Sequence, residues 1–257
     1  MKWALLTGAS WGIGEAMARE LAAREWGLVL TARSEDRLHA LAGELRDHYG
    51  VPVEVLAGDL TDPAMPAELE AATEGTPIDL LVNNAGFGGY GPFVESELER
   101  EIRMIELNVT AVTELTKRFV RPMVERGHGR ILNVASTAAF QPGPLMAVYY
   151  ATKAYVLSFS EALREELKGT GVTVTTLCPG PTASEFQGRA DMEGSPLFER
   201  LTLPTSAEVA RYGVEAALRG KGIAVHGRMN RILAFAGRFA PRSLLPAIVR
   251  RIQEKRG

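Results

Sequence analysis

Tyr149 and Lys153 stand four residues apart in the segment Val148-Tyr-Tyr-Ala-Thr-Lys. On a helix, side chains at this spacing share one face, so the lysine ammonium can lie near the phenol oxygen. A nearby cation lowers the pKa of a tyrosine, and moving that pKa from about 10 to near 7 needs roughly 4 kcal/mol. A tyrosine with such a pKa is a general acid and base for alcohol–ketone chemistry. Tyr150 has no lysine four residues later, so we assign it to packing or substrate contact.

The N-terminal segment has the pattern of a strand, a glycine-rich turn and a helix. The apolar run Trp3–Thr7 leads directly into Thr7-Gly-Ala-Ser-Trp-Gly-Ile-Gly, and a helical spacing of apolar residues follows. In such a unit the backbone N–H groups and the helix dipole face an anion, and glycine allows close approach. An ordinary tight turn is the alternative, but three glycines in this context favour a dinucleotide. The expected contact residues are Gly8, Ser10, Trp11, Gly12, Ile13 and Gly14.

Five further features follow this turn along the chain. They are Asn83-Asn-Ala-Gly86, Asn108, Ser136, the Tyr149–Lys153 pair and Pro179-Gly180. Together with the TGxxxGxG turn they resemble the short-chain dehydrogenase/reductase family, over essentially the whole chain but less clearly after residue 182. The resemblance implies a Rossmann-like fold, a nicotinamide cofactor, and hydride transfer on the B face of the nicotinamide.

Apolar strand patterns alternate with helical patterns along the chain. This alternation specifies a doubly wound parallel sheet of about seven strands, with helices on both faces. No internal repeat or linker marks a second domain, so we expect residues 1–257 to form a single α/β domain. The expected strands are 3–7, 27–32, 52–57, 78–83, 130–135, 172–178 and 223–226, and the expected helices are 13–25, 35–48, 64–74, 96–126, 148–168 and 206–219.

The end of the second expected strand indicates which dinucleotide is bound. A fold selective for NAD usually has an acid there to hold the ribose 2′-hydroxyl. This chain has Arg33-Ser34, with Arg37 one turn later, and an arginine fork matches a 2′-phosphate. Glu35 and Asp36 argue the other way, but they lie past the strand end and suit a helix start. NADP is therefore favoured over NAD, although Trp11 stands where NADP enzymes of the family often have a basic residue.

The resemblance also implies the remaining cofactor contacts. Residues 59–60 match the segment beside the adenine ring, and residues 83–86 end the fourth strand, where Asn83 and Asn84 can equally serve only to brace the sheet edge. Residues 179–182 match the loop beside the nicotinamide, with Thr182 as the candidate for the carboxamide or pyrophosphate. The residues assigned in this way are Asp59, Leu60, Asn84, Ala85, Gly86, Pro179, Gly180 and Thr182.

Four residues receive catalytic roles from the resemblance. Tyr149 donates a proton to the ketone oxygen, or removes it from the alcohol in the reverse reaction. Lys153 lowers the pKa of the tyrosine and holds the nicotinamide ribose. Ser136 polarises the substrate carbonyl by hydrogen bonding, and Asn108 carries a proton-relay water. An asparagine inside a long apolar helix is poorly explained by helix propensity, which favours a function for Asn108.

Length and composition agree with a single globular domain, and we expect the protein to be cytoplasmic. The 257 residues are 46% apolar, enough for a sizeable core, and no stretch approaches the roughly 20 apolar residues of a membrane span. The first apolar run leaves no room for a signal peptide before it. The single cysteine, Cys178, lies in an apparent buried strand and suits a reducing compartment. The four histidines show no metal-ligand spacing, so we expect no metal site.

Three segments are candidates for the substrate pocket: residues 87–93, residues 140–146 and a loop over residues 183–205. They carry several aromatic and aliphatic side chains, with Glu185 and Arg189 among them. This mixture indicates a small to medium, moderately apolar ketone or aldehyde, acyl or aromatic in character. The same apolar residues could simply cover a closed lid, and the sequence does not name a substrate.

The C-terminal extension, residues 227–257, differs in charge from the rest of the chain. It has eight arginines and lysines against one acid, whereas the whole chain has a net charge of −2. Its apolar residues recur at helical spacing on either side of Pro241, which predicts two short basic amphipathic helices. Such helices can lie on an acidic membrane or dock on the same or a partner subunit, which we favour. Nucleic-acid binding is not expected, because aromatic residues do not alternate with the basic ones.

Two other functions share parts of this pattern. A dinucleotide-sensing protein of the same fold would bind without turnover, but such relatives typically lose the tyrosine or the lysine. A sugar-nucleotide epimerase or dehydratase shares the tyrosine–lysine pair, but usually has another glycine spacing and a longer C-terminal domain. We also expect a homodimer or homotetramer, because the helices at 96–126 and 148–168 carry a second apolar stripe and pair across subunits in the family.

Overall fold

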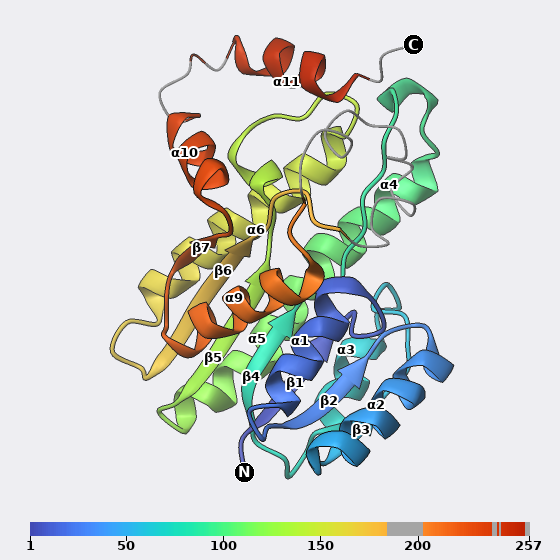
Figure 1. Ribbon diagram of the computed structural model, residues 1–257, viewed down its shortest axis with the longest axis vertical. Coiled ribbons are helices and arrows are strands. Elements are labelled where there is room, and N and C mark those ends of the chain that lie inside the picture. The colour runs from blue at the N-terminus through green and yellow to red at the C-terminus, as the bar shows by residue number, and fades with distance from the viewer. Residues whose placement is uncertain (184–202, 238–240, 242, 255–257) are drawn as a thin grey trace.

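The computed structural model describes residues 1–183, 203–237, 241 and 243–254. Its centre is one sheet of seven parallel strands in the order β3-β2-β1-β4-β5-β6-β7 (Figure 1). The doubly wound α/β fold expected from the sequence is therefore confirmed. The strands are β1 Trp3–Thr7, β2 Gly27–Thr31, β3 Val53–Val55, β4 Ile78–Asn83, β5 Gly129–Val134, β6 Val172–Cys178 and β7 Ile223–Val225.

Alternation of side chains along the buried strands divides the core into two layers. In β1, Ala4 and Leu6 face one cluster of apolar side chains, and Leu5 faces the other. Helices α1 (Gly12–Ala22), α2 (Glu35–Tyr49) and α9 (Ser206–Leu218) cover the first face. The second face is covered by α3 (Met65–Ala72), α5 (Ala111–Glu125) and α6 (Ala147–Glu166). A parallel sheet needs both covers, because neither face of its strands is polar.

The long helix expected over residues 96–126 is interrupted. The chain forms α4 (Leu98–Ile105), then a π-helical turn η2 (Glu106–Thr110), then α5. Apolar spacing continues through this region, so the sequence pattern does not reveal the turn. A π turn inserts one residue into the helical ladder, and such turns are frequent at functional sites. Asn108 lies inside it.

The C-terminal extension forms the two expected helices, α10 (Arg228–Ala236) and α11 (Leu245–Gln253). They lie beyond the end of the sheet opposite the N-terminus, coloured red in Figure 1. Docking of their apolar stripe on the same chain is not observed, because Ile232, Phe235, Ile248 and Ile252 are each at least 50% exposed. The buried residues of α11 are Val249 and Gln253 instead. Phe239, which the helical spacing of apolar residues also places in this stripe, lies outside the described residues.

None of the helices in the described ranges is both long and apolar enough to cross a membrane. Cys178 is buried at the end of β6, and burial raises the pKa of its thiol to about 12, as suits a core residue. The described residues contain no group of three histidine, cysteine or acidic side chains that could hold a metal ion.

Candidate active site

The loop between β1 and α1 allows another group to approach its backbone closely. Gly8 and Gly12 have φ angles of +64° and +55°, which residues with a Cβ rarely adopt. A Cβ on Gly8 would come within 2.9 Å of the Ala85 Cα, and one on Gly14 would collide with the carbonyl oxygen of Gly8. Helix α1 begins after Trp11 without a side-chain cap. Its first N–H groups are thus donors for an anion, and the loop fits a dinucleotide pyrophosphate.

Asn84 joins this loop to the neighbouring strand. Its side-chain nitrogen donates to the carbonyl oxygens of Thr7, at 3.0 Å, and Gly8, at 3.1 Å. In return, the Thr7 hydroxyl accepts from the backbone nitrogens of Asn84 and Ala85. These bonds fix the carboxyl ends of β1 and β4, where the strand order reverses and where ligands of doubly wound sheets bind. The bracing role that the sequence left open for Asn84 is thus observed.

Arg33 follows β2 and points two-thirds of its side chain into solvent. One guanidinium nitrogen lies 3.9 Å from the Asp59 carboxylate, and no acid stands at the strand end itself. Ser34, the next residue, is the N-cap of α2, and its side chain makes no capping bond there. An exposed arginine with a loose ion pair can turn to a 2′-phosphate at little cost.

Arg37 supplies a contact that the sequence did not reveal. Its guanidinium stacks over the indole ring of Trp11, and one of its nitrogens donates to the carbonyl oxygen of Ser10 at 3.5 Å. Trp11 replaces the basic residue often found at this place in NADP enzymes, but the stacked arginine restores a cation beside Gly12. A spacing of 26 residues separates the two side chains, so only the fold brings them together.

Asp59 stands between two arginines. Its carboxylate accepts a bond from Arg103 at 2.9 Å and from the Thr61 backbone and hydroxyl. Burial opposes ionisation of Asp59, but the Thr61 bonds and the charges of Arg33 and Arg103 together hold its pKa below the ordinary value. The neighbouring Leu60 is buried in the core layer of α3. Asp59 therefore remains an acceptor at the edge expected to hold the adenine.

Ser136 and Tyr149 meet at the carboxyl end of β5. Ser136 begins the short 3-10 helix η3 (Thr137–Phe140), and its hydroxyl accepts from the backbone nitrogen of Ala138 at 3.1 Å. Tyr149 lies in the first turn of α6 and hydrogen bonds with the Ser136 side chain. Burial raises the pKa of Tyr149 to about 12, and the Ser136 bond opposes that rise. The expected pKa near 7 is thus not observed in this state.

Lys153 is bound to a backbone oxygen of β5, and burial alone is the main cause of the high pKa of Tyr149. Its ammonium donates to the carbonyl oxygen of Val134 at 2.9 Å and lies 5.9 Å from the centre of the Tyr149 ring. Burial lowers the pKa of Lys153 to about 8. The two side chains share a helix face as the spacing predicts, but β5 holds the ammonium and desolvation dominates the tyrosine. A lysine that shifts toward the phenol would lower the pKa of Tyr149.

Asn108 connects the loop after β4 to helix α6. Its side-chain oxygen accepts from the Phe87 backbone nitrogen at 3.1 Å, and its nitrogen donates to the Phe87 oxygen and the Thr152 hydroxyl, both at 3.0 Å. A Cβ on Gly86 would come within 2.8 Å of the Asn108 oxygen and 3.3 Å of the Lys153 ammonium. The π turn therefore aims Asn108 at the same point as Lys153, and Gly86 leaves room for both.

Asn133 was missed by sequence reasoning, and it pairs with Asn83, for which the sequence left a bracing role open. Asn83 donates to the Thr116 hydroxyl at 3.1 Å and to the Asn133 side-chain oxygen at 2.8 Å, and Asn133 donates to the Ser160 hydroxyl at 2.9 Å. This chain of bonds ties β4 and β5 to α5 and α6. Asn133 stands three residues before Ser136, and its polar side chain in an apolar strand was the available signal. Its role is to fix the strand end from which Ser136 projects.

The segment after β6 is held from two sides. The backbone nitrogen of Thr137 donates to the carbonyl oxygen of Pro179 at 2.8 Å, and the Thr182 hydroxyl donates to the Gly180 oxygen at 3.0 Å. A Cβ on Gly180 would collide with the side chain of Asn230 in α10. The basic extension therefore packs directly on the loop expected beside the nicotinamide, a contact that the sequence did not predict.

Tyr149 lines a cavity of about 330 Å³. Tyr90, Phe93 and Met146 contribute apolar surface, and Arg100 and Glu97 contribute charge. Two of the three segments expected to form the substrate pocket, 87–93 and 140–146, thus reach this cavity. Of the third, residues 184–202 lie outside the described part of the chain.

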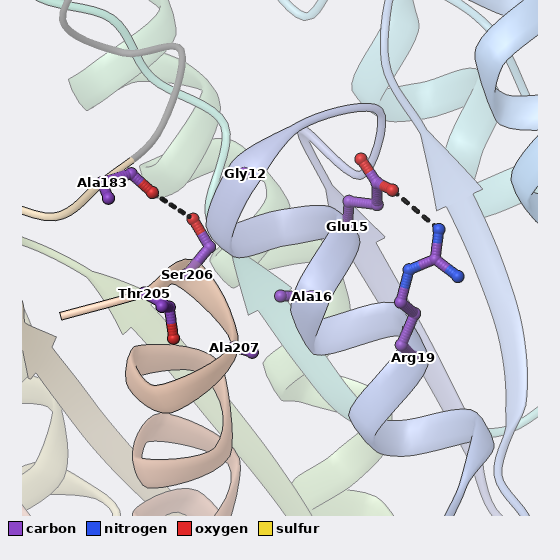
Figure 2. Close-up of a pocket in the computed structure, with 8 residues that line it drawn as sticks. All are labelled: Gly12, Glu15, Ala16, Arg19, Ala183, Thr205, Ser206 and Ala207. Carbon is purple, nitrogen blue, oxygen red and sulfur yellow. Dashed lines mark hydrogen bonds and ion pairs between the residues drawn. The ribbon is translucent and has the colours of Figure 1, made fainter.

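A second hollow, of about 590 Å³, lies between α1 and α9 (Figure 2). It is lined at one end by Gly12 and at the other by the Glu15–Arg19 ion pair, whose atoms are 2.8 Å apart. Ser206 donates to the Ala183 oxygen at 3.1 Å across its edge. None of the four expected catalytic residues lines it, whereas Tyr149 lines the smaller cavity.

Comparison with known proteins agrees with this geometry. Residues 2–193 match the family model described as short chain dehydrogenase. The chain belongs to that family. Like its relatives, it is an oxidoreductase that interconverts a carbonyl and an alcohol.

Three members of the family illustrate how similar this short-chain dehydrogenase is to known proteins. The very-long-chain 3-oxoacyl-CoA reductase of Mus musculus is 33% identical over 235 residues, 90% of this chain and 74% of its own. A short-chain dehydrogenase of Sphingobium yanoikuyae, solved in complex with NADPH, is 36% identical with a TM-score of 0.84, covering 93% and 94% of the two chains. The bulky-bulky ketone specific alcohol dehydrogenase of Comamonas testosteroni is 30% identical with a TM-score of 0.80, covering 96% and 99%.

Proposed function

We propose that this short-chain dehydrogenase is an NADP-dependent enzyme that reduces a moderately apolar ketone with substantial groups on both sides of the carbonyl. The observation that carries the cofactor assignment is the pair formed by Arg33, after β2, and Arg37, in the first turn of α2. Arg33 is free to turn, Arg37 stacks on Trp11 beside Gly12, and no acid stands at the strand end. The Sphingobium relative, solved with NADPH, supports the same assignment.

The catalytic roles follow from the contacts at the carboxyl end of β5. When bound, the nicotinamide supplies the hydride. Ser136 bonds to Tyr149 and is placed to polarise a substrate carbonyl at the same point. Tyr149 then gives its phenol proton to the developing alkoxide, and Lys153 moves from the Val134 carbonyl toward the phenolate to stabilise it. Asn108 keeps the loop around Phe87 and Gly86 open to Lys153.

The substrate proposal rests on the cavity beside Tyr149. Its lining combines aromatic and aliphatic side chains with a few charges, which suits an apolar molecule with one or two polar groups. The ketone-specific Comamonas enzyme and the mouse acyl-CoA reductase act on carbonyl substrates with bulky or long groups by their names. We place the enzyme in the cytoplasm.

We further propose that the enzyme is a homodimer or homotetramer through α4, α5 and α6. Leu98, Ile102 and Ile105 of α4 and Tyr155 of α6 are exposed at 65%, 45%, 39% and 38%. Apolar side chains in a row on one surface are unusual for a monomer. A second copy of the same face would cover them, as the family pattern of paired helices implies.

Turnover is the direct test of the proposed function. Purified protein is incubated with NADPH and a panel of aryl alkyl, dialkyl and β-keto thioester carbonyls, and loss of NADPH absorbance is followed. We expect reduction of several apolar ketones and slower reaction with NADH. A protein that binds NADPH but reduces no carbonyl would be the dinucleotide sensor instead.

A further inference from the structure

Gln253 is an amide buried at the end of an otherwise exposed helix. It is 1% exposed, whereas Ile248 and Ile252 on the same helix are 50% and 51% exposed. Val249, one turn earlier, is 3% exposed. Helix α11 thus buries one narrow stripe, and the polar member of that stripe lies deepest. Buried polar groups normally have hydrogen-bond partners, so the partners of Gln253 indicate the role of this side chain.

Two tyrosines hold Gln253. The Tyr90 hydroxyl donates to its backbone oxygen at 2.8 Å, and its side-chain nitrogen donates to the Tyr150 hydroxyl. Tyr90 lines the cavity that contains Tyr149. The Tyr150 ring meets the Tyr149 ring edge to face, with centres 6.1 Å apart. Gln253 therefore hydrogen bonds with two of the aromatic residues that pack around Tyr149.

The side-chain oxygen of Gln253 is buried and has no hydrogen-bond partner within the described residues. The nitrogen of the same amide is paired, so the side chain is fixed with one acceptor unused. An unpaired buried acceptor destabilises the protein unless a ligand satisfies it. Gln253 does not itself line the cavity that contains Tyr149, but its partner Tyr90 does. A substrate group that extends past Tyr90 would therefore supply the missing donor.

We propose that Gln253 is a specificity-determining residue, whose side-chain oxygen accepts a hydrogen bond from a hydroxyl or amide N–H of the substrate. This proposal rests on the proposed function, because it takes the cavity beside Tyr149 as the substrate pocket. The preferred substrate is then a ketone with a hydrogen-bond donor at a set distance from the reacting carbonyl. Sites built to bond a substrate donor discriminate strongly against the analogue that lacks it.

The experiment compares phenyl alkyl ketones of increasing chain length, each with and without a terminal hydroxyl. The ratio of kcat/KM within each pair is measured for the wild type, Gln253→Leu and Tyr150→Phe. Gln253→Leu removes the acceptor, whereas Tyr150→Phe removes the partner of the amide nitrogen and leaves the acceptor in place. NADPH affinity and melting temperature are measured for all three proteins.

We expect the wild type to favour the hydroxylated ketone about tenfold or more at one chain length, chiefly through KM. Gln253→Leu should abolish this preference with NADPH affinity unchanged, and Tyr150→Phe should keep most of it. A wild-type enzyme with no preference at any length, or equal loss of preference in both variants, would overturn the proposal. If the wild type reduces none of these ketones, the proposed function fails. The ratio of ketone dissociation constants, measured by calorimetry with NADPH present, then still tests Gln253.

Discussion

Lys153 donates its ammonium hydrogen bond to the backbone oxygen of Val134, 2.9 Å away, and not to the phenol of Tyr149. The lysine is 6% exposed, and burial lowers its pKa to about 8. Burial also raises the pKa of Tyr149 to about 12. Both groups are therefore shifted toward their neutral forms. The proposed proton transfer therefore requires the ammonium to move from the Val134 oxygen toward the phenol, where it would lower the pKa of Tyr149.

The shifted lysine predicts how stability depends on pH. Its folded pKa of about 8 is below the model value of 10.5, so the unfolded chain binds more protons between these values. From this group alone, the free energy of unfolding rises with pH from about 8 to 10.5, by roughly 3 kcal/mol in total. Above pH 9 the raised pKa values of Cys178 and Tyr149 act in the opposite direction, so the rise is measured between pH 8 and 9. Denaturant melts of the cofactor-free protein measure this slope. In Lys153→Met, the rise should largely disappear; a rise of unchanged size would show that Lys153 is not its source.

Tyr149→Phe should abolish turnover while leaving NADPH affinity within a few-fold of the wild type. The change removes the proton donor and little shape, and general acid catalysis contributes typically 10²–10⁴-fold. Tyr150→Phe is the matched control on the next residue, and we expect it to lose far less of kcat. Steady-state rates and fluorescence titration with NADPH separate the two effects. An inactive Tyr150 variant beside an active Tyr149 variant would reverse the assignment.

Arg33→Asp should weaken NADPH binding much more than NADH binding. The substitution replaces the charge proposed to face the 2′-phosphate with a repulsive one, and a bond to a charged group is worth about 1.5–3 kcal/mol. We expect a loss of roughly 10- to 100-fold for NADPH, measured by fluorescence titration. Arg24→Asp, two residues after the C-terminal end of α1, is the charge-matched control. Equal losses for both cofactors would show that Arg33 does not contact the 2′-phosphate.

The sequence predicts those parts of the fold and site that depend on local patterns. The run Trp3–Thr7 and the turn to Gly14 are recognisable because strand, turn and helix follow one another directly. The π turn at Asn108 is not, because the apolar spacing of its neighbours continues unchanged on both sides. Lys153 was placed on the correct helix face, but its partner is a backbone oxygen of a distant strand, which has no side-chain signature.

The contacts of the C-terminal extension could not be predicted from the sequence either, because they involve polar residues that the helical pattern assigns to solvent. Gln253 and Asn230 are polar residues in amphipathic helices, where polar residues are usually placed toward solvent. One is nevertheless buried under Tyr90 and Tyr150, and the other occupies the space that Gly180 leaves. A helix pattern identifies which residues share a face, but it does not identify what that face contacts.

The proposed oligomer predicts that Ile102→Glu will dissociate the protein. The side chain is 45% exposed on α4 in the single chain, so a charge there should not unfold the subunit but would be buried at an interface between copies. Sedimentation should show a dimer or tetramer for the wild type and particles of 27.8 kDa for the variant. Glu74→Lys, at an exposed position after α3, controls for the change of charge. Wild-type particles of 27.8 kDa at micromolar concentration would count against the oligomer.

The exposed stripe of the C-terminal extension leads to the last prediction. Ile232 and Phe235 of α10 and Ile248 of α11 are 60%, 62% and 50% exposed on their own chain, so docking on a partner subunit is the form of protein docking that remains. The extension has eight basic residues against one acid, and the rest of the chain is acidic. The extension of one copy is therefore attracted to the acidic remainder of another copy. Changing these three residues to serine should lower the melting temperature and shift the sedimentation coefficient toward the monomer, because each loses apolar burial at the interface. Co-sedimentation with vesicles of anionic lipid at low salt is measured in parallel. Wild-type protein that binds the vesicles, together with a variant that keeps its oligomer and melting temperature but no longer binds, would assign the stripe to a membrane surface.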